Sequence, residues 1–148
     1  MKIKLKRLHK DAIIPTYATE GSAAVDLYAV EDYSIKIGGV IWLRTGIAIE
    51  VPEGYYAEIY NRSSMAAKHE VVIVSSRVID SDYRGEITVP VKLIANNIPI
   101  PMIYSVPIKK GDRIAQMMIK KSICISFGEV EELSETSRGS GGFGSTGV

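Results

Sequence analysis

The chain has 148 residues, a length that suits one domain with one hydrophobic core. Its net charge is only +1, so no broad electrostatic field points to nucleic acid or to an anionic membrane, although a small anionic substrate stays open. No apolar run approaches the roughly 20 residues of a membrane span, and the basic start has no signal-peptide pattern. We therefore expect a soluble protein without membrane or direct nucleic-acid partners.

Cys124 is the only cysteine, so an internal disulfide is excluded and a reducing compartment is the default. In its apolar surroundings it is expected to be a small buried or half-buried side chain. A cytoplasmic location follows as the expectation, with a nuclear or virus-encoded setting left open.

Short alternating or apolar runs, separated by turn residues, dominate the chain. They predict strands at 1–6, 25–29, 33–37, 40–43, 47–51, 55–60, 71–74, 86–93, 102–106, 114–119 and 123–127. One helix is predicted, at 63–69, where Ser63 and Ser64 can cap and Met-Ala-Ala-Lys favours helix. Many short strands at even spacing predict an all-β sandwich or barrel with one short helix.

The last eleven residues, 138–148, are almost all Gly, Ser and Thr around Phe143. Such a segment buries too little apolar surface to offset its ordering entropy, so 132–148 is expected to be a flexible Gly-rich arm beyond a β-barrel domain at 1–131. Fully extended, the last eleven residues reach on the order of 36 Å, far enough to touch a neighbouring subunit.

The glycine spacing in this arm matches a dinucleotide fingerprint only nominally, because no helix can follow it. Backbone N–H groups, hydroxyls and Arg138 remain, and these groups can wrap a phosphate. The alternative is a solvated terminus, against which the lone aromatic Phe143 argues.

Two polar groups interrupt the strands. Arg62, Ser63 and Ser64 combine guanidinium, hydroxyl and N–H donors at a helix start, which indicates anion binding or, alternatively, an ordinary N-cap. The segment 78–87 places Asp80 and its neighbours between apolar strands, which indicates either a site or a polar hairpin turn.

The chain offers no zinc-ligand pattern, no Ser nucleophile elbow and no His-based triad. Any hydrolysis is therefore expected to use a carboxylate and a metal–phosphate complex. Mg²⁺ would be held mainly by the phosphates of the substrate and by water.

Five segments, taken in this order, resemble the five motifs of the trimeric dUTPase family: 23–29, 62–66, 78–87, 111–117 and 138–147. The resemblance covers nearly the whole chain. It implies a β jelly-roll subunit, a homotrimer with shared active sites, and dUTP as the substrate. The implied reaction is hydrolysis of dUTP to dUMP and pyrophosphate, which keeps uracil out of DNA and supplies dUMP for thymidylate synthesis.

The resemblance also implies roles for the residues of the third motif. Asp80 would be the general base that deprotonates the water attacking the α-phosphorus. Tyr83 would pack against the deoxyribose and leave no room for a 2′-hydroxyl. The hairpin 71–79 would hold uracil, and its substrate-binding residues are Arg77, Val78 and Ile79.

In the same family pattern, phosphates and water are held by Arg62, Ser63, Ser64 and Gln116. Asp26 would support hydrated Mg²⁺, the implied cofactor. The arm would close from another subunit, with Phe143 stacking on uracil. The other substrate-binding residues of the arm are Arg138, Gly144, Ser145 and Thr146, of which Arg138, Ser145 and Thr146 would reach phosphate oxygens.

Three positions depart from the family pattern: Ala24 and Arg77 stand where Gly is usual, and Asn61 stands where Pro is common. Within the same fold, a dCTP deaminase or a bifunctional deaminase and diphosphatase is the nearest alternative. A nucleotide-dependent binding or regulatory module is the alternative from another class. The intact Asp80–Tyr83 pair and the Phe-bearing arm favour the hydrolase.

Overall fold

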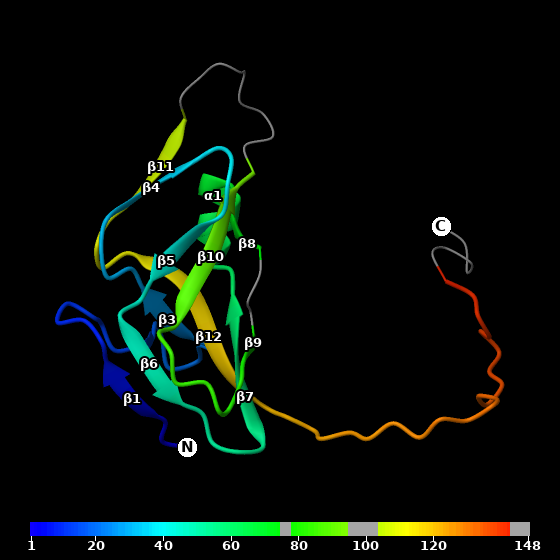
Figure 1. Ribbon diagram of the computed structural model, residues 1–148. Helices are drawn as coiled ribbons and strands as arrows, with labels where there is room; N and C mark the ends of the chain where they lie inside the picture. The colour runs from blue at the N-terminus through cyan, green and yellow to red at the C-terminus, as the bar shows by residue number, and fades with distance from the viewer. Residues whose placement is uncertain (75–77, 95–103, 143–148) are drawn as a thin grey trace.

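The computed structural model describes residues 1–74, 78–94 and 104–142 (Figure 1). Strands dominate it, and α1 (Ser63–His69) coincides with the helix predicted from the sequence. The strands are β1 (Lys4–Arg7), β2 (Thr16–Tyr17), β3 (Val25–Tyr28), β4 (Tyr33–Lys36), β5 (Ile41–Arg44), β6 (Ile47–Glu50), β7 (Tyr55–Tyr60), β8 (Val71–Ile73), β9 (Val78–Ile79), β10 (Thr88–Leu93), β11 (Ser105–Ile108) and β12 (Arg113–Lys121). The expected all-β class with one short helix is confirmed.

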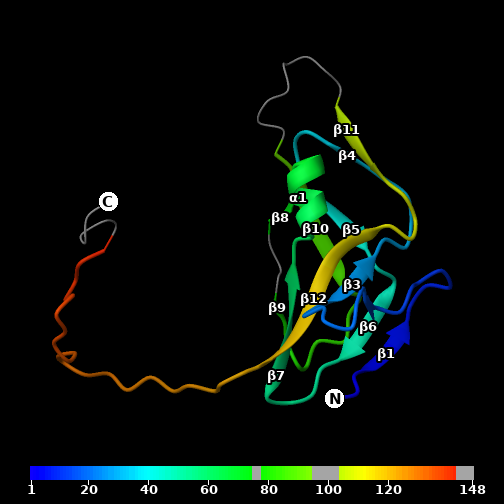
Figure 2. The ribbon, with the colours of Figure 1, turned by 180° about the vertical axis from the view of Figure 1, so that it is seen from behind.

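Antiparallel pairing organises these strands. The largest sheet has the order β2-β3-β12-β7-β9, and a three-stranded sheet has the order β5-β10-β8. Two further pairs, β1-β6 and β11-β4, extend the body, so that the strands wrap around one core as a jelly roll (Figures 1 and 2). β12 is the longest strand and pairs with both β3 and β7, which makes it the centre of the largest sheet.

The core is apolar, and in several strands alternate residues point into it. In β7, Ala57 and Ile59 are buried while their neighbours are only half-buried, and β5 buries Leu43 between less buried neighbours. Asp26 and Thr45 are the buried polar residues of the described chain. Within the described ranges, no helix is long and apolar enough to cross a bilayer.

The chain beyond β12 differs from the sequence-based prediction. Residues 123–127 form no strand, and Cys124 is exposed rather than buried. Ile123, Ile125 and Phe127 are 84 %, 71 % and 93 % exposed, and the segment runs away from the body (Figures 1 and 2). A strand needs a hydrogen-bonding neighbour, and in the described chain this segment pairs with none.

Candidate active site

A polar cluster surrounds the buried carboxylate of Asp26, and we name it the Asp26 cluster: Asp26, Arg62, Arg113 and Gln116. Asp26 lies on β3 directly opposite Gln116 on β12, and directly opposed residues of an antiparallel pair share one face. Gln116 also lies opposite Tyr60, the last residue of β7. Arg62 follows Tyr60 by two residues, which places it near Asp26 and Gln116. Pairing across the largest sheet therefore assembles the cluster.

Three donors approach the Asp26 carboxylate, which is only 1 % exposed. Arg62 Nε lies 3.1 Å from Oδ1 and Arg113 Nη1 lies 3.4 Å from Oδ2. Gln116 Nε2 donates to Oδ1 at 3.4 Å. A buried carboxylate needs such partners to offset its desolvation. With two guanidinium groups and one carboxylate, the cluster keeps a net positive charge that suits an anion.

The Arg62 side chain has a specific geometry within this cluster. Its Nη1 donates to the backbone oxygen of Arg113 at 3.2 Å. Its Nε is close enough to Asp26 for an ion pair, but the N–H does not point at an acceptor of the described chain. The contact is therefore electrostatic rather than a well-formed hydrogen bond, and it leaves one buried donor unsatisfied.

Arg113 was not singled out by the sequence patterns. Alternation with period two places residues three apart on opposite faces of a strand, so Arg113 and Gln116 should not meet the same carboxylate. The register of β12 against β3 shifts between Arg113 and Ala115, as in a β-bulge. The extra residue turns Arg113 toward Asp26. The sequence contains no pattern that predicts this bulge.

Ser63 and Ser64 occupy the first turn of α1, directly after Arg62. The prediction that these serines cap the helix is wrong, because the N-cap is Arg62 and it has no side-chain capping bond. Met65 and Ala66 instead donate their N–H groups to the Arg62 carbonyl, at 3.1 and 3.2 Å. The helix thus begins one residue earlier than a serine cap would require.

A second group lines a separate cavity of about 210 Å³, which we name the Asp80 pocket. Three of the predicted site residues, Val78, Ile79 and Asp80, come from β9 and the turn that follows it. Tyr83 also lines the pocket, and its N–H donates to the Asp80 carbonyl at 3.2 Å, which closes the turn. The structure thus brings these four predicted site residues together at one cavity, while their roles stay predictions.

The Tyr83 ring is held in place by its own turn. Its hydroxyl donates to the backbone oxygen of Glu86 at 3.1 Å. A Cβ added at Gly85 would overlap the Tyr83 hydroxyl and ring, so glycine is required for this close approach. Glu86 is itself fixed, since it accepts hydrogen bonds from Arg44 Nε at 3.0 Å and from Gly46 N at 2.8 Å.

Glu86 has an electrostatic effect on the arginine that holds it. The hydrogen bond and the negative charge of Glu86 raise the pKa of Arg44 above its usual value. The positive charge of Arg44 therefore neutralises the carboxylate of Glu86, which lines the Asp80 pocket.

Three further residues line the Asp80 pocket: Trp42 and Thr88, which lie outside the five motif segments, and Glu86, which lies in the third motif but was assigned no role from the sequence. Trp42 lies on β5, opposite Pro90 of β10. None of Asp26, Arg62, Arg113 or Gln116 lines this pocket. The chain therefore carries two half-sites, one cationic and one with carboxylate and aromatic groups.

The hairpin expected to hold uracil begins at β8, which Asn61 anchors. Asn61 Oδ1 accepts a hydrogen bond from Ile73 N at 2.7 Å. A proline at position 61 has no side-chain acceptor, so the departure from the family pattern adds a contact here. Arg77, in the same hairpin, lies outside the described residues.

Residues 132–142, the described part of the arm, lie away from the strands that carry both half-sites in the same chain (Figure 1). Arg138 closes a local turn, because its Nε donates to the Gly141 carbonyl at 2.8 Å. The other site residues predicted in the arm lie outside the described part of the chain, and these are Phe143, Gly144, Ser145 and Thr146.

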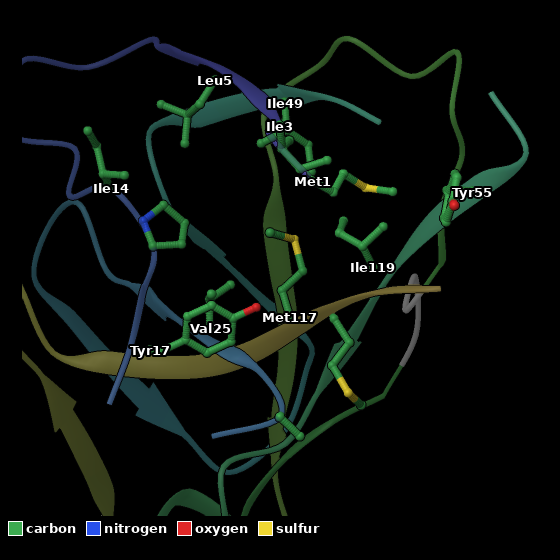
Figure 3. A pocket seen from close by; sticks show the side chains of 13 residues that line it. Met1, Ile3, Leu5, Ile14, Tyr17, Val25, Ile49, Tyr55, Met117 and Ile119 are labelled. Atoms are coloured by element: carbon green, nitrogen blue, oxygen red, sulfur yellow. The ribbon is translucent and has the colours of Figure 1, made fainter. Parts of the chain in front are cut away.

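Another cavity is lined mainly by apolar side chains and contains none of the predicted site residues (Figure 3). Its volume is about 520 Å³, and no charged side chain lines it. Ile3 and Leu5 line one wall, and Met117 and Ile119 of β12 line another. A cavity lined by apolar side chains and two tyrosines, without Asp, Glu, His, Lys or Arg, suits packing rather than catalysis. Among the described residues, no group of three or more His, Cys, Asp or Glu could hold a metal ion.

Comparison with known proteins agrees with this arrangement. The dUTPase family model matches residues 10–147. Deoxyuridine 5′-triphosphate nucleotidohydrolase of Helicobacter pylori (strain Shi470) is 43 % identical over 149 residues, covering 100 % of this chain and 98 % of that protein. The enzyme of the same name from Hydrogenobaculum sp. (strain Y04AAS1) is 45 % identical over 150 residues, covering 100 % and 99 %.

A solved structure shows the same likeness in three dimensions. It is a mutant dUTPase of Staphylococcus bacteriophage 80alpha with dUpNHpp, 27 % identical, with a TM-score of 0.87 over 99 % of each chain. The family match includes both half-sites and the arm, and the similarity in sequence extends over the full length. The chain therefore belongs to the dUTPase family.

Proposed function

We propose that the protein hydrolyses dUTP to dUMP and pyrophosphate, through attack of water on the α-phosphorus. Membership of the dUTPase family supports this proposal. The observation that carries it is the Asp80 pocket, where a carboxylate and the fixed ring of Tyr83 open on the same cavity. A proton acceptor beside a wall for a sugar is what selective hydrolysis of a deoxynucleotide requires.

Asp80 is the general base in this mechanism. It is exposed at the end of β9, so a water molecule can reach its carboxylate and transfer a proton to it. Tyr83 packs against the deoxyribose, and the hydrogen bond of its hydroxyl to the Glu86 carbonyl orients the ring over Gly85, which leaves room for it. A 2′-hydroxyl would collide with that ring, which excludes UTP.

The Asp26 cluster binds the triphosphate. Arg62 and Arg113 supply positive charge, and Ser63 and Ser64 supply hydroxyl and N–H donors at the start of α1. Among the described residues, Arg113 donates to Asp26 Oδ2 at 3.4 Å, and this oxygen has a second lone pair that can accept a hydrogen bond from a metal-bound water. Mg²⁺ would be held by the phosphates of the substrate and by water beside Asp26, and it would neutralise part of the phosphate charge.

A homotrimer brings these half-sites together. Asp80 and its pocket on one subunit face the Asp26 cluster of another, and the arm of a subunit closes over the bound nucleotide through Arg138 and the residues after it. The separation of the two half-sites within one chain supports this assembly, since neither half alone has both a base and cations.

The exposed segment after β12 supports the same assembly. Ile123, Ile125 and Phe127 alternate as in a strand but meet no apolar surface of their own body. Such a row of exposed apolar side chains marks an interaction surface. We assign it to the apolar cavity of a neighbouring subunit, which it fills as an added strand.

The experiment that tests the function is release of pyrophosphate from dUTP, UTP, dTTP and dCTP, each with and without Mg²⁺. We expect turnover of dUTP alone, dependent on Mg²⁺, by a protein that sediments as a trimer. Ammonia released from dCTP would instead indicate the deaminase. A monomer that leaves dUTP intact would overturn the proposal.

A further inference from the structure

Trp42 is the only tryptophan of the chain, and its side chain is 51 % exposed. It lies on β5 beside Leu43, which points into the core and is completely buried. Since adjacent residues of a strand face opposite sides, the indole points away from the core. A large aromatic side chain that is half-exposed on a sheet contributes little to packing, which leaves binding as its use.

The pairing of β5 with β10 places this indole at the Asp80 pocket. Trp42 lies opposite Pro90, and Thr88 is two residues before Pro90 on the same face of β10. Thr88 and Trp42 both line the pocket, together with Asp80 and Tyr83. The indole therefore belongs to the wall of the cavity into which the catalytic carboxylate opens.

The charge of the pocket decides which part of a nucleotide meets that wall. Asp80 and Glu86 are its two charged lining residues, and both are acidic. Arg44 neutralises Glu86, so Asp80 carries the remaining negative charge. Arg62 and Arg113, in contrast, belong to the Asp26 cluster, which lines none of this cavity. Phosphate is repelled from an acidic and aromatic cavity, whereas a neutral sugar and base can pack against its rings.

We propose that Trp42 is a nucleoside-binding residue, whose indole packs alongside Tyr83 against the sugar and base of the bound nucleotide. This inference rests on the proposed hydrolysis of dUTP and deepens it. Trp42 lies outside all five family motifs, so the residue adds to the substrate contacts that the motifs supply.

Because the chain has a single tryptophan, fluorescence excited at a wavelength that tyrosine does not absorb reports on this residue alone. The full-length protein is titrated with dUpNHpp, with dUMP and with inorganic triphosphate, all in magnesium buffer. We expect dUpNHpp and dUMP to change the emission and to reduce quenching by acrylamide, while triphosphate leaves both unchanged. An unchanged emission with dUpNHpp, or an equal response to triphosphate, would overturn the inference.

Substitution gives a second, independent measurement. We expect Trp42→Leu to raise the KM for dUTP roughly fivefold or more, as for the loss of one aromatic stacking contact, with kcat within about twofold. Trp42→Phe keeps an aromatic face and should restore most of the affinity. Val40→Ala is the matched control, because Val40 is also exposed, at 46 %, just before β5 but does not line the pocket.

The outcomes separate this inference from the proposed function. If the wild-type protein hydrolyses dUTP but Trp42→Leu has an unchanged KM, only the role of Trp42 falls. If the wild-type protein leaves dUTP intact, the proposed function is rejected, and the role of Trp42 that rests on it is rejected as well. If Trp42→Leu dissociates the trimer at an unchanged KM, Trp42 is a subunit contact and the inference is overturned.

Discussion

At the scale of single residues, the most unusual feature is the buried carboxylate of Asp26. A carboxylate that is 1 % exposed is unfavourable unless charged and polar partners replace its hydration. Arg62, Arg113 and Gln116 supply those partners and leave the cluster positive. The same contacts therefore serve stability and, in the proposed function, substrate binding.

Removal of one partner tests the energetic part of this argument. Arg62→Gln should lower the free energy of unfolding by about 1–3 kcal/mol, less than the cost of isolating a buried charge, because Arg113 and Gln116 remain. Urea unfolding at a fixed protein concentration measures this change in the free energy of unfolding. Lys4→Gln is the control, since Lys4 and its partner Glu50 are exposed and should contribute less than about 1 kcal/mol. Equal effects of the two substitutions would contradict the argument.

The general base has its own test. Asp80→Asn keeps the size of the side chain but removes the proton acceptor, so kcat for dUTP should fall by about 100-fold or more while the protein stays folded. Steady-state pyrophosphate release measures kcat, and circular dichroism checks the fold. Asp82→Asn is the matched control in the same turn, because Asp82 does not line the pocket and its loss should leave kcat within about twofold. A near-normal rate for Asp80→Asn would remove Asp80 from the mechanism.

At the scale of elements, Tyr33 links two sheets that are otherwise joined by a single bridge between Ile37 and Leu93 in the described chain. It lies on β4, which pairs with β11, while Arg44 lies on β5, which pairs with β10. The Tyr33 hydroxyl accepts the Arg44 N–H at 2.8 Å and donates to Glu31 at 2.7 Å. Burial raises the pKa of Tyr33 to about 12, and the Glu31 carboxylate acts in the same direction.

The sign of this shift predicts how stability depends on pH. The native pKa exceeds the ordinary value of 10.0, so the neutral hydroxyl stabilises the fold below pH 10.0 and that contribution is lost as pH rises through about 12. Tyr33→Phe should cost about 1–2 kcal/mol at pH 7, because the Arg44 N–H loses its acceptor. The difference in unfolding free energy between the two proteins should shrink above pH 10. A difference that stays constant from pH 7 to 12 would contradict this assignment.

At the scale of the whole molecule, the segment beyond β12 has two parts with different expected roles. Residues 122–133 carry exposed apolar side chains for assembly, and residues 138–148 carry the Gly-rich motif for closure over the substrate. Regular structure ends at Lys121, and the boundary expected at 131 stays a prediction.

Two truncations separate these roles. Deletion of 138–148 should leave a folded trimer with little turnover of dUTP, because only the closing segment is lost. Deletion of 122–148 should also weaken the trimer, because Ile123, Ile125 and Phe127 no longer cover a neighbouring subunit. Sedimentation measures assembly, and pyrophosphate release measures turnover. Full activity of the shorter deletion, or an intact trimer of the longer one, would reject the corresponding role.

Local patterns in the sequence determined the all-β class, the helix at Ser63–His69 and strand β7 at Tyr55–Tyr60, because these depend on alternation and propensity within a few residues. The order of the five motifs indicated the family and grouped Asp80 with Tyr83, since both lie in one turn. The same locality explains the failed strand at 123–127: its alternation is real, but a strand also requires a partner, and alternation carries no information about one.

Only the tertiary structure decided which distant residues meet. A bulge in β12 turns Arg113 toward Asp26, and the pairing of β5 with β10 brings Trp42 to the Asp80 pocket. It also decided that the two half-sites lie apart within one chain. Register, bulges and cavity walls arise from contacts between residues as far apart as Asp26 and Gln116, 90 positions along the chain. Such contacts depend on how whole strands align, which no short stretch of sequence encodes.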